Sequence, residues 1–201
     1  MKDILQSAID NKHTSKLPRE GWQSQNDLTG RFIRNILNNI CSKIDSYLEI
    51  GLYRGGTFSA ALWGNEIHAV GVDDWSQNWG IGSSKDEFLS KYLESKGYNT
   101  VDIYDISCWD VDLSAFKFDA YLFDGPHGYS DQYDALVRFI DQMNDQFIYI
   151  VDDYDHEKSP LVVKGVQDSI IDLKLKKTSE FYCPAGYGFH EGIYFCSLEK
   201  V

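Results

Sequence analysis

The chain of 201 residues has a mass of 23.0 kDa and a formal net charge of -12. This length is enough for one domain that buries its own core, and the acidic surface argues against a nucleic-acid partner because it repels phosphate backbones. The sequence contains no apolar run of the roughly 20 residues that span a membrane and no signal peptide at its start. The four cysteines lack CxxC spacing, which predicts reduced thiols and no zinc site. We therefore expect a cytoplasmic protein without a membrane partner that acts on a small neutral or cationic molecule.

The N-terminal part, residues 1–44, is expected to be helical. Helices are predicted over Asp3–Asn11 and Asn26–Ser42, separated by a loop that contains Trp22. Because this segment precedes the first core strand, it could cover a ligand as a lid, or it could simply pack against the edge of the sheet. Trp22 is a large aromatic residue in a polar loop, and substrate contact is one interpretation of it.

The stretch that organises the chain is residues 47–63. Residues 47–50 are a short apolar run typical of a buried strand, glycines follow at Gly51, Gly55 and Gly56, and helical periodicity begins at Thr57, the expected N-cap. Glycines let a backbone approach a ligand closely, and a helix N-terminus offers free N–H groups. This strand, turn and helix predict the binding site of a nucleotide-like cofactor.

The pattern of strand followed by helix then repeats. Strands are predicted at residues 68–72, 100–104, 118–123 and 146–151, with helices at 84–96, 130–143 and 161–173. Such alternation predicts a parallel sheet covered on both faces. Residues 178–183 and 192–198, joined by a glycine-rich loop, predict a closing antiparallel hairpin. No repeat or linker interrupts the pattern, so residues 1–201 are expected to form a single domain.

Carboxylates follow the predicted strands. Asp73, Asp105, Asp124 and Asp152 each stand at the end of one strand. A single Asp after a strand is usually a helix N-cap. Ligands in open α/β sheets, however, bind outside the carboxyl ends of the strands, so acids at several ends together indicate a site.

Together, the order of elements and the motif Glu49-x-Gly51-x-x-x-Gly55-Gly56-Thr57 resemble a class I S-adenosylmethionine-dependent methyltransferase, over about residues 45 to 198. The resemblance implies a three-layer Rossmann-like α/β fold with a seven-stranded mixed sheet, and residues 45–201 as the cofactor-binding core. It further implies that Asp73 binds the ribose hydroxyls, that Asp105 meets the adenine amino group and that Trp75 covers the adenine. The residues that it assigns to the cofactor are Glu49, Gly51, Gly55, Gly56, Thr57, Asp73, Asp74, Trp75, Asp105 and Asp124.

The chemistry of this cofactor agrees with the residue types. Adenosylmethionine carries ribose hydroxyls that a carboxylate accepts from, and a sulfonium cation that an acidic mouth attracts, but no phosphate. The glycine loop departs from the G-x-G-x-x-G spacing of dinucleotide sites. This departure weakens the case for a pyrophosphate cradle. Two alternatives are kept: an oxidoreductase that binds a nicotinamide cofactor, which would need phosphate ligands in this loop, and a non-catalytic module that binds adenosylmethionine.

A second pair of motifs is Asp124-Gly-Pro-His127-Gly-Tyr and Asp152-Asp153-Tyr154. They resemble the D-G-x-H-x-Y and D-D-Y motifs of small-molecule O-methyltransferases of the methyltransferase-24 type. The resemblance implies that Asp124, Asp152 and Asp153 hold Mg²⁺, which would lower the pKa of a substrate hydroxyl. With a pKa near its ordinary value, His127 could act as the base, or it could be a turn residue bonded to the backbone.

These observations predict O-methylation of a small hydroxylated acceptor, such as a sugar or a secondary-metabolite phenol, with Asp124 and His127 as catalytic residues. Segments at 73–82, 154–157 and 186–190 are expected to border the same site, with Trp79 either in its wall or in the core. A monomer and a homodimer formed through the N-terminal helices are both compatible with the sequence.

Overall fold

The computed structural model describes residues 1–18, 29–76, 84–184 and 192–201. Trp22, Trp79 and the loop at 186–190 therefore lie outside the described residues. Within them, no helix is long and apolar enough to cross a membrane. All four cysteines are free, as expected.

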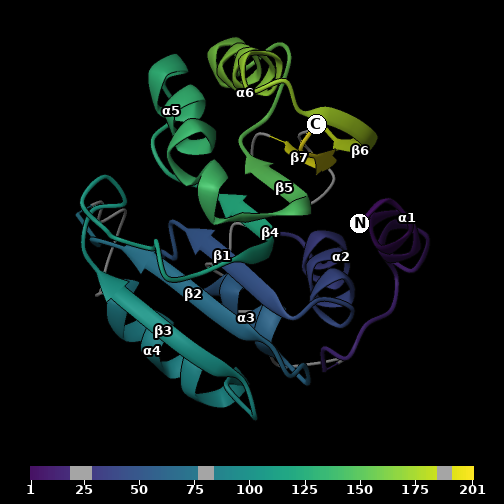
Figure 1. Ribbon diagram of the computed structural model, residues 1–201. Coiled ribbons are helices and arrows are strands. Elements are labelled where there is room, and N and C mark those ends of the chain that lie inside the picture. Colours follow the sequence, from purple (N-terminus) through teal and green to yellow (C-terminus); the bar gives the residue numbers. More distant parts are fainter. Residues whose placement is uncertain (19–28, 77–83, 185–191) are drawn as a thin grey trace.

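A seven-stranded mixed sheet forms the centre of the molecule, as the sequence predicts (Figure 1). Its strand order is β3-β2-β1-β4-β5-β7-β6, and β7 runs against the other six strands. The predicted terminal hairpin, β6 with β7, is therefore confirmed. The strands are β1 (Ser46–Ile50), β2 (His68–Asp73), β3 (Thr100–Asp105), β4 (Phe118–Phe123), β5 (Met143–Asp152), β6 (Lys176–Cys183) and β7 (Ile193–Glu199).

Two helical layers cover the faces of this sheet. The helices are α1 (Lys2–Asp10), α2 (Arg31–Cys41), α3 (Gly56–Leu62), α4 (Ser84–Ser95), α5 (Tyr129–Phe139) and α6 (Pro160–Asp172). Side chains of α1, α2, α3 and α4 pack on one face, and those of α5 and α6 pack on the other (Figure 1). The β3–β4 connection contains no helix, and its residues 106–117 pack beside α5 and α6 instead. Successive residues of a strand point to opposite faces, so each central strand contributes to both cores.

Two predicted helix boundaries are wrong. The helix expected to start at Asn26 begins at Arg31, because Gly30 is extended at its N-cap (φ -70, ψ 158). The helix expected to continue to Met143 ends at Phe139 and tightens into a 3₁₀ turn over Ile140–Gln142.

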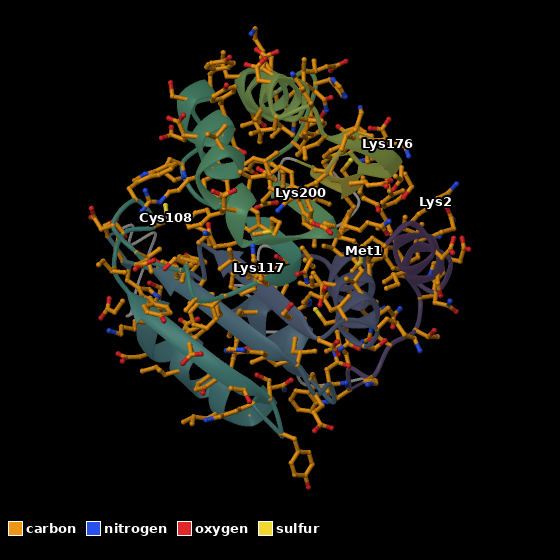
Figure 2. All side chains as sticks on the ribbon, in the orientation of Figure 1. Met1, Lys2, Cys108, Lys117, Lys176 and Lys200 are labelled. Atoms are coloured by element: carbon orange, nitrogen blue, oxygen red, sulfur yellow. The ribbon has the colours of Figure 1, made fainter. Side chains whose placement is uncertain are left out.

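Two lysines stabilise this early helix end. Figure 2 labels both residues, Lys117 and Lys200. Lys117 donates to the carbonyl of Asp141, and Lys200 donates to the carbonyl of Met143 at 2.6 Å. Carbonyls at a helix end lack intrahelical partners, so these amino groups complete their hydrogen bonding. Both lysines come from distant parts of the chain, which is why local periodicity did not reveal them.

Candidate active site

The turn after β1 is held between the ends of its two neighbouring strands. Gly51 N–H donates to the carbonyl of Val72 at 2.9 Å, and Asp124 N–H donates to the carbonyl of Ile50 at 2.8 Å. In the adjacent pair, Asp73 lies opposite Asp105. The structure therefore places the predicted acids along one edge of the sheet, at the carboxyl ends of its parallel strands.

The glycines of this turn make room for the chain itself. Gly51 has a φ of +89, and a Cβ built on it would lie 1.9 Å from the carbonyl oxygen of Asp124. Gly55 has a φ of +76, and its Cβ would lie 2.7 Å from the ring of Phe88 in α4. Both residues must be glycine for internal packing, which is a reason that the sequence interpretation, based on a ligand, did not include.

Glu49 lies fully buried in β1 beneath the turn. Its carboxyl accepts hydrogen bonds from the hydroxyl of Tyr47 and, at 2.6 Å, from that of Thr57. Burial raises the pKa of Glu49 to about 8, although the two hydroxyls oppose this. Thr57 is therefore not the N-cap that we expected: α3 begins at Gly56 with Gly55 as its N-cap, and Thr57 lies in the first turn. Tyr47, which the sequence analysis missed, could have been found from its i, i+2 spacing to Glu49.

Three carboxyl groups form what we call the acid row: Glu49, Asp124 and Asp152. They stand at the ends of β1, β4 and β5, and the residues two positions earlier belong to the core under α2 and α3, so all three side chains leave the same face. Burial raises the pKa of Asp124, and burial together with the charge on Asp124 raises that of Asp152 further. Asp152 Oδ1 is buried without a hydrogen-bond partner in the described structure. The row favours either bound protons or a cation nearby.

The carboxylate of Asp73 accepts hydrogen bonds from the backbone of the glycine turn. Its Oδ2 accepts the N–H groups of Leu52 and Tyr53 at 2.7 Å each, and its Oδ1 accepts that of Trp75 at 2.6 Å. A carboxylate offers about four acceptor positions, so three are filled and about one remains for a ribose hydroxyl. Asp73 therefore acts first as a clamp on the turn, and simultaneous contact with two hydroxyls would require it to release a backbone group.

The remaining residues assigned to the adenosine lie at the same edge, next to α4. Trp75 donates its indole N–H to the carbonyl of Tyr53 at 3.1 Å, and the ammonium of Lys85 lies 4.9 Å from its ring centre. Lys85 also pairs with the exposed Asp105. Asp74 is exposed and accepts the N–H of Ser76 at 2.9 Å; the side chain of Ser76, and then this N–H, lower the pKa of Asp74. The contribution of α4 was not anticipated, because Lys85 carries no motif.

His127 lies between two acids. Its Nδ1 is 2.9 Å from Asp153 Oδ2, and its Nε2 is 3.8 Å from Asp124 Oδ1. These carboxylates, Asp124 before Asp153, raise the pKa of His127 to about 10, so the imidazole is protonated at neutral pH. The expectation of a pKa near the ordinary value is thus wrong, and so is the alternative of a turn residue that bonds only to backbone.

The predicted metal ligands come together only in part. Asp124, Asp152 and Asp153 provide the oxygen atoms that Mg²⁺ prefers. Asp153 is turned toward His127, however, and the imidazolium stands between the carboxylates of Asp153 and Asp124. Among the described residues, no group of three acids, histidines or cysteines is arranged to hold a metal ion. In this arrangement the three carboxylates do not fit a divalent ion, and the function proposed for the site does not involve one.

Comparisons with known proteins agree on the fold. No protein-family model matches the sequence, and no curated protein matches it either. Among solved structures, a protein from Streptococcus mutans described as an adenosylmethionine-dependent methyltransferase superposes with a TM-score of 0.65 at 13% identity over 90% of this chain. This chain spans about half of that protein, 51% of its length.

Two other solved structures match over nearly their whole length. The O-methyltransferase TomG from Streptomyces achromogenes, in complex with adenosylmethionine, has a TM-score of 0.59 at 16% identity, over 99% of this chain and 90% of its own. A protein from Pyrococcus horikoshii described as an RNA methyltransferase has a TM-score of 0.60 at 14% identity, over 100% of this chain and 97% of its own. The chain thus has the Rossmann-like fold of adenosylmethionine-dependent methyltransferases, and these neighbours differ in the acceptors that they are described to methylate.

The raised pKa of Glu49 predicts a specific dependence of stability on pH. The folded chain keeps this proton up to about pH 8, whereas an exposed glutamate releases it near 4.5, so the free energy of unfolding falls as pH rises through this window. Glu49→Gln cannot titrate. We expect wild type to lose stability relative to this variant by up to about 1.4 kcal/mol per pH unit. Urea unfolding across the window measures this, with Glu199→Gln at the partly exposed end of β7 as control; parallel curves for wild type and Glu49→Gln would contradict it.

The clamp role of Asp73 predicts an effect without any ligand. Asp73→Asn retains one acceptor oxygen but sets an amide NH₂ against the N–H groups of the turn, so we expect the ligand-free protein to lose about 1–3 kcal/mol of stability. Asp105→Asn, at an exposed strand end, serves as control and should change stability by less than about 0.5 kcal/mol. Thermal unfolding compares the two. Equal, small effects would mean that Asp73 does not organise the turn.

Proposed function

We propose that the protein is an adenosylmethionine-dependent methyltransferase that methylates a hydroxyl group on a small molecule. The observation that carries this proposal is the acid row, Glu49, Asp124 and Asp152, beside His127 at the carboxyl edge of a methyltransferase-like sheet. Partly desolvated carboxyls with raised pKa values gain from a cation placed next to them. Adenosylmethionine brings such a cation, the sulfonium group that carries the transferable methyl.

The residues around the row have separate tasks in this proposal. The turn clamped by Asp73 and the glycines sets the position of the cofactor, and Glu49 stabilises positive charge once it has lost its proton. Asp124 and Asp153 hold the ring of His127. A further positive charge at the acid row opposes the imidazolium and lowers the pKa of His127, so that it can accept the hydroxyl proton of the acceptor. Alignment of the hydroxyl with the methyl group supplies much of the remaining rate.

A small acceptor is favoured over a nucleic acid by charge. The chain has 31 acidic and 19 basic residues, and the candidate site is lined by carboxyl groups that repel phosphates. TomG, a neighbour of similar length, is described as an O-methyltransferase in tomaymycin synthesis, which supports a hydroxylated secondary metabolite here as well. A sugar hydroxyl agrees with the same site chemistry.

Calorimetric titration tests the cofactor directly. We expect adenosylmethionine to bind, NADH not to bind, and binding of adenosylmethionine to strengthen as pH rises toward 8 because Glu49 must release its proton. Titrations with and without Mg²⁺ address the predicted metal, and the arrangement of His127 leads us to expect no change. Binding of NADH instead would favour an oxidoreductase, and binding of neither ligand would contradict the proposal. Tighter binding or turnover that depends on Mg²⁺ would show that Asp153 turns from His127 to an ion.

Substitution of His127 tests whether the protein is an enzyme and not a binding module. We expect His127→Ala to reduce methyl transfer to a probe acceptor, catechol, by about 10²–10⁴-fold, because the proton acceptor is lost. The affinity for adenosylmethionine should be kept or should rise, because the imidazolium that opposes its sulfonium group is removed. His68→Ala removes another histidine that pairs with an aspartate, Asp102 at 2.8 Å, but at the start of β2, away from the carboxyl edge, and is a matched control with unchanged transfer expected. Transfer that survives in His127→Ala would remove the base role.

A further inference from the structure

The turn that follows β5 determines where Asp153 points. Asp153 has a φ of 53, in the left-handed region that a non-glycine residue rarely adopts. This backbone conformation directs the Asp153 side chain to His127, 2.9 Å away. Relaxation of the turn to an ordinary φ would move the carboxylate, so something else must hold the turn.

The next residue, Tyr154, is fixed on three sides. Its N–H donates to the carbonyl of Gly192 at 3.2 Å. Its ring, which is 2% exposed, stacks on Tyr194 of β7 with centres 4.4 Å apart and planes inclined by 14°. Its hydroxyl accepts a hydrogen bond of 2.7 Å from the amide of Gln167 in α6. Contacts with helix α6, with strand β7 and with Gly192 thus fix the position of Tyr154.

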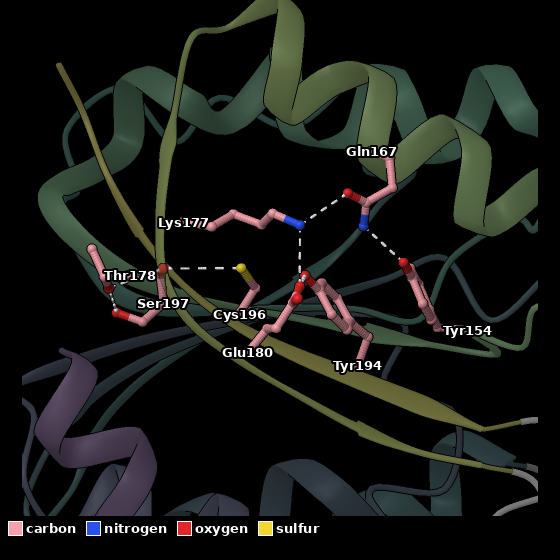
Figure 3. Close-up of polar contacts among 8 residues, drawn as sticks. All are labelled: Tyr154, Gln167, Lys177, Thr178, Glu180, Tyr194, Cys196 and Ser197. Carbon is pink, nitrogen blue, oxygen red and sulfur yellow. Dashed lines mark hydrogen bonds and ion pairs between the residues drawn. The ribbon is translucent and has the colours of Figure 1, made fainter.

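A chain of polar contacts, which Figure 3 shows, orients this amide, and the stacking of Tyr154 on Tyr194 closes the chain into a ring of contacts. Lys177 donates to Gln167 Oε1 at 3.3 Å and to Glu180 at 3.1 Å, and the hydroxyl of Tyr194 donates to the same Glu180. Because the lysine occupies the amide oxygen, the NH₂ group is the one that faces Tyr154. These contacts therefore fix both the amide of Gln167 and the aromatic ring of Tyr194 on which Tyr154 stacks.

We propose that Gln167, Tyr154 and Tyr194 are positioning residues for the candidate active site: they hold the turn after β5 so that Asp153 meets His127. The catalytic consequence rests on the proposed function. The geometric consequence, the contact between Asp153 and His127, does not depend on it. In the described structure, none of the three forms a side-chain hydrogen bond with His127 or the acid row, so their effect passes through the backbone of the turn.

The hydrogen bond between Gln167 and Tyr154 should matter more for the position of the turn than the contacts of Lys177. The side chains of Lys177 and Glu180 are 38% and 54% exposed, and ion pairs at such positions contribute little. The bond between Gln167 and Tyr154 is partly buried, and loss of its donor leaves a hydroxyl on a side chain that is almost inaccessible to water. Substitution of Gln167 should therefore disturb the contact between Asp153 and His127 more than substitution of Lys177 does.

The test compares Gln167→Met with wild type. Met has a similar length but no N–H donor, so we expect the downfield imidazole N–H signal of His127 in proton NMR to broaden or vanish, as Asp153 leaves it. With catechol as the probe acceptor, kcat should fall about tenfold while KM for adenosylmethionine stays constant. Gln167→Glu should restore both readouts to within about twofold, because a carboxylate accepts from Tyr154 and pairs with Lys177. Tyr154→Phe removes the same bond from the other side and should reproduce the loss.

Two matched controls separate positioning from general loosening. Tyr133→Phe removes another tyrosine hydroxyl bound to α6, at Asp172, and Lys176→Met removes an exposed ion pair with Glu199 next to Lys177. Neither should affect the His127 signal, and thermal unfolding verifies that every variant is folded. If Gln167→Met and Tyr133→Phe give the same His127 signal, the proposal is overturned. If wild type transfers no methyl group, the proposed function fails, but the NMR comparison still decides the role of Gln167.

Discussion

The candidate site depends on the close approach of Gly51 to the carbonyl of Asp124. A Cβ at Gly51 would lie 1.9 Å from that oxygen, so only glycine allows the end of β1 to meet the end of β4. This contact joins the turn that we assign to the cofactor to the motif that contains His127. Any side chain at position 51 would separate the two by displacing backbone, which a close-packed interior resists. In the proposed function, cofactor placement and acceptor chemistry are therefore coupled through this backbone contact.

The charges of the carboxyl groups at the strand ends are the second feature that defines the candidate site. The sheet brings Glu49, Asp124 and Asp152 to one face, where burial makes their negative charge costly. His127 compensates part of it as an imidazolium between Asp124 and Asp153. The candidate site thus contains one positive charge, that of the protonated His127. It attracts a second cation more strongly when His127 has lost this proton. In the proposed function, this exchange links the binding of adenosylmethionine to the protonation of His127 without any change of fold.

Much of the fold could be predicted because its signals are local. Strand and helix periodicity gave the seven strands and the closing hairpin, and each strand-end acid stands where the pattern put it. The missed features involve partners far away in sequence. Two of the three N–H groups that occupy Asp73 come from residues 20 and 21 positions earlier. The pKa of His127 is raised by Asp124 and then by Asp153, which lies at the end of another strand and has a left-handed backbone. Residue type alone cannot reveal whether a carboxylate faces a ligand or its own chain.

Backbone strain is concentrated where the chemistry is proposed. Of the non-glycine residues with positive φ in the described structure, Tyr53, Trp75 and Asp153 follow β1, β2 and β5 at the same edge of the sheet. Such conformations cost about 1–3 kcal/mol each and persist only when the surroundings hold them. Asp73 and the indole of Trp75 hold the first two, and the residues around Tyr154 hold the third. Because the sheet and its helices meet this cost during folding, the turns are arranged before a ligand arrives, and binding energy remains available for alignment.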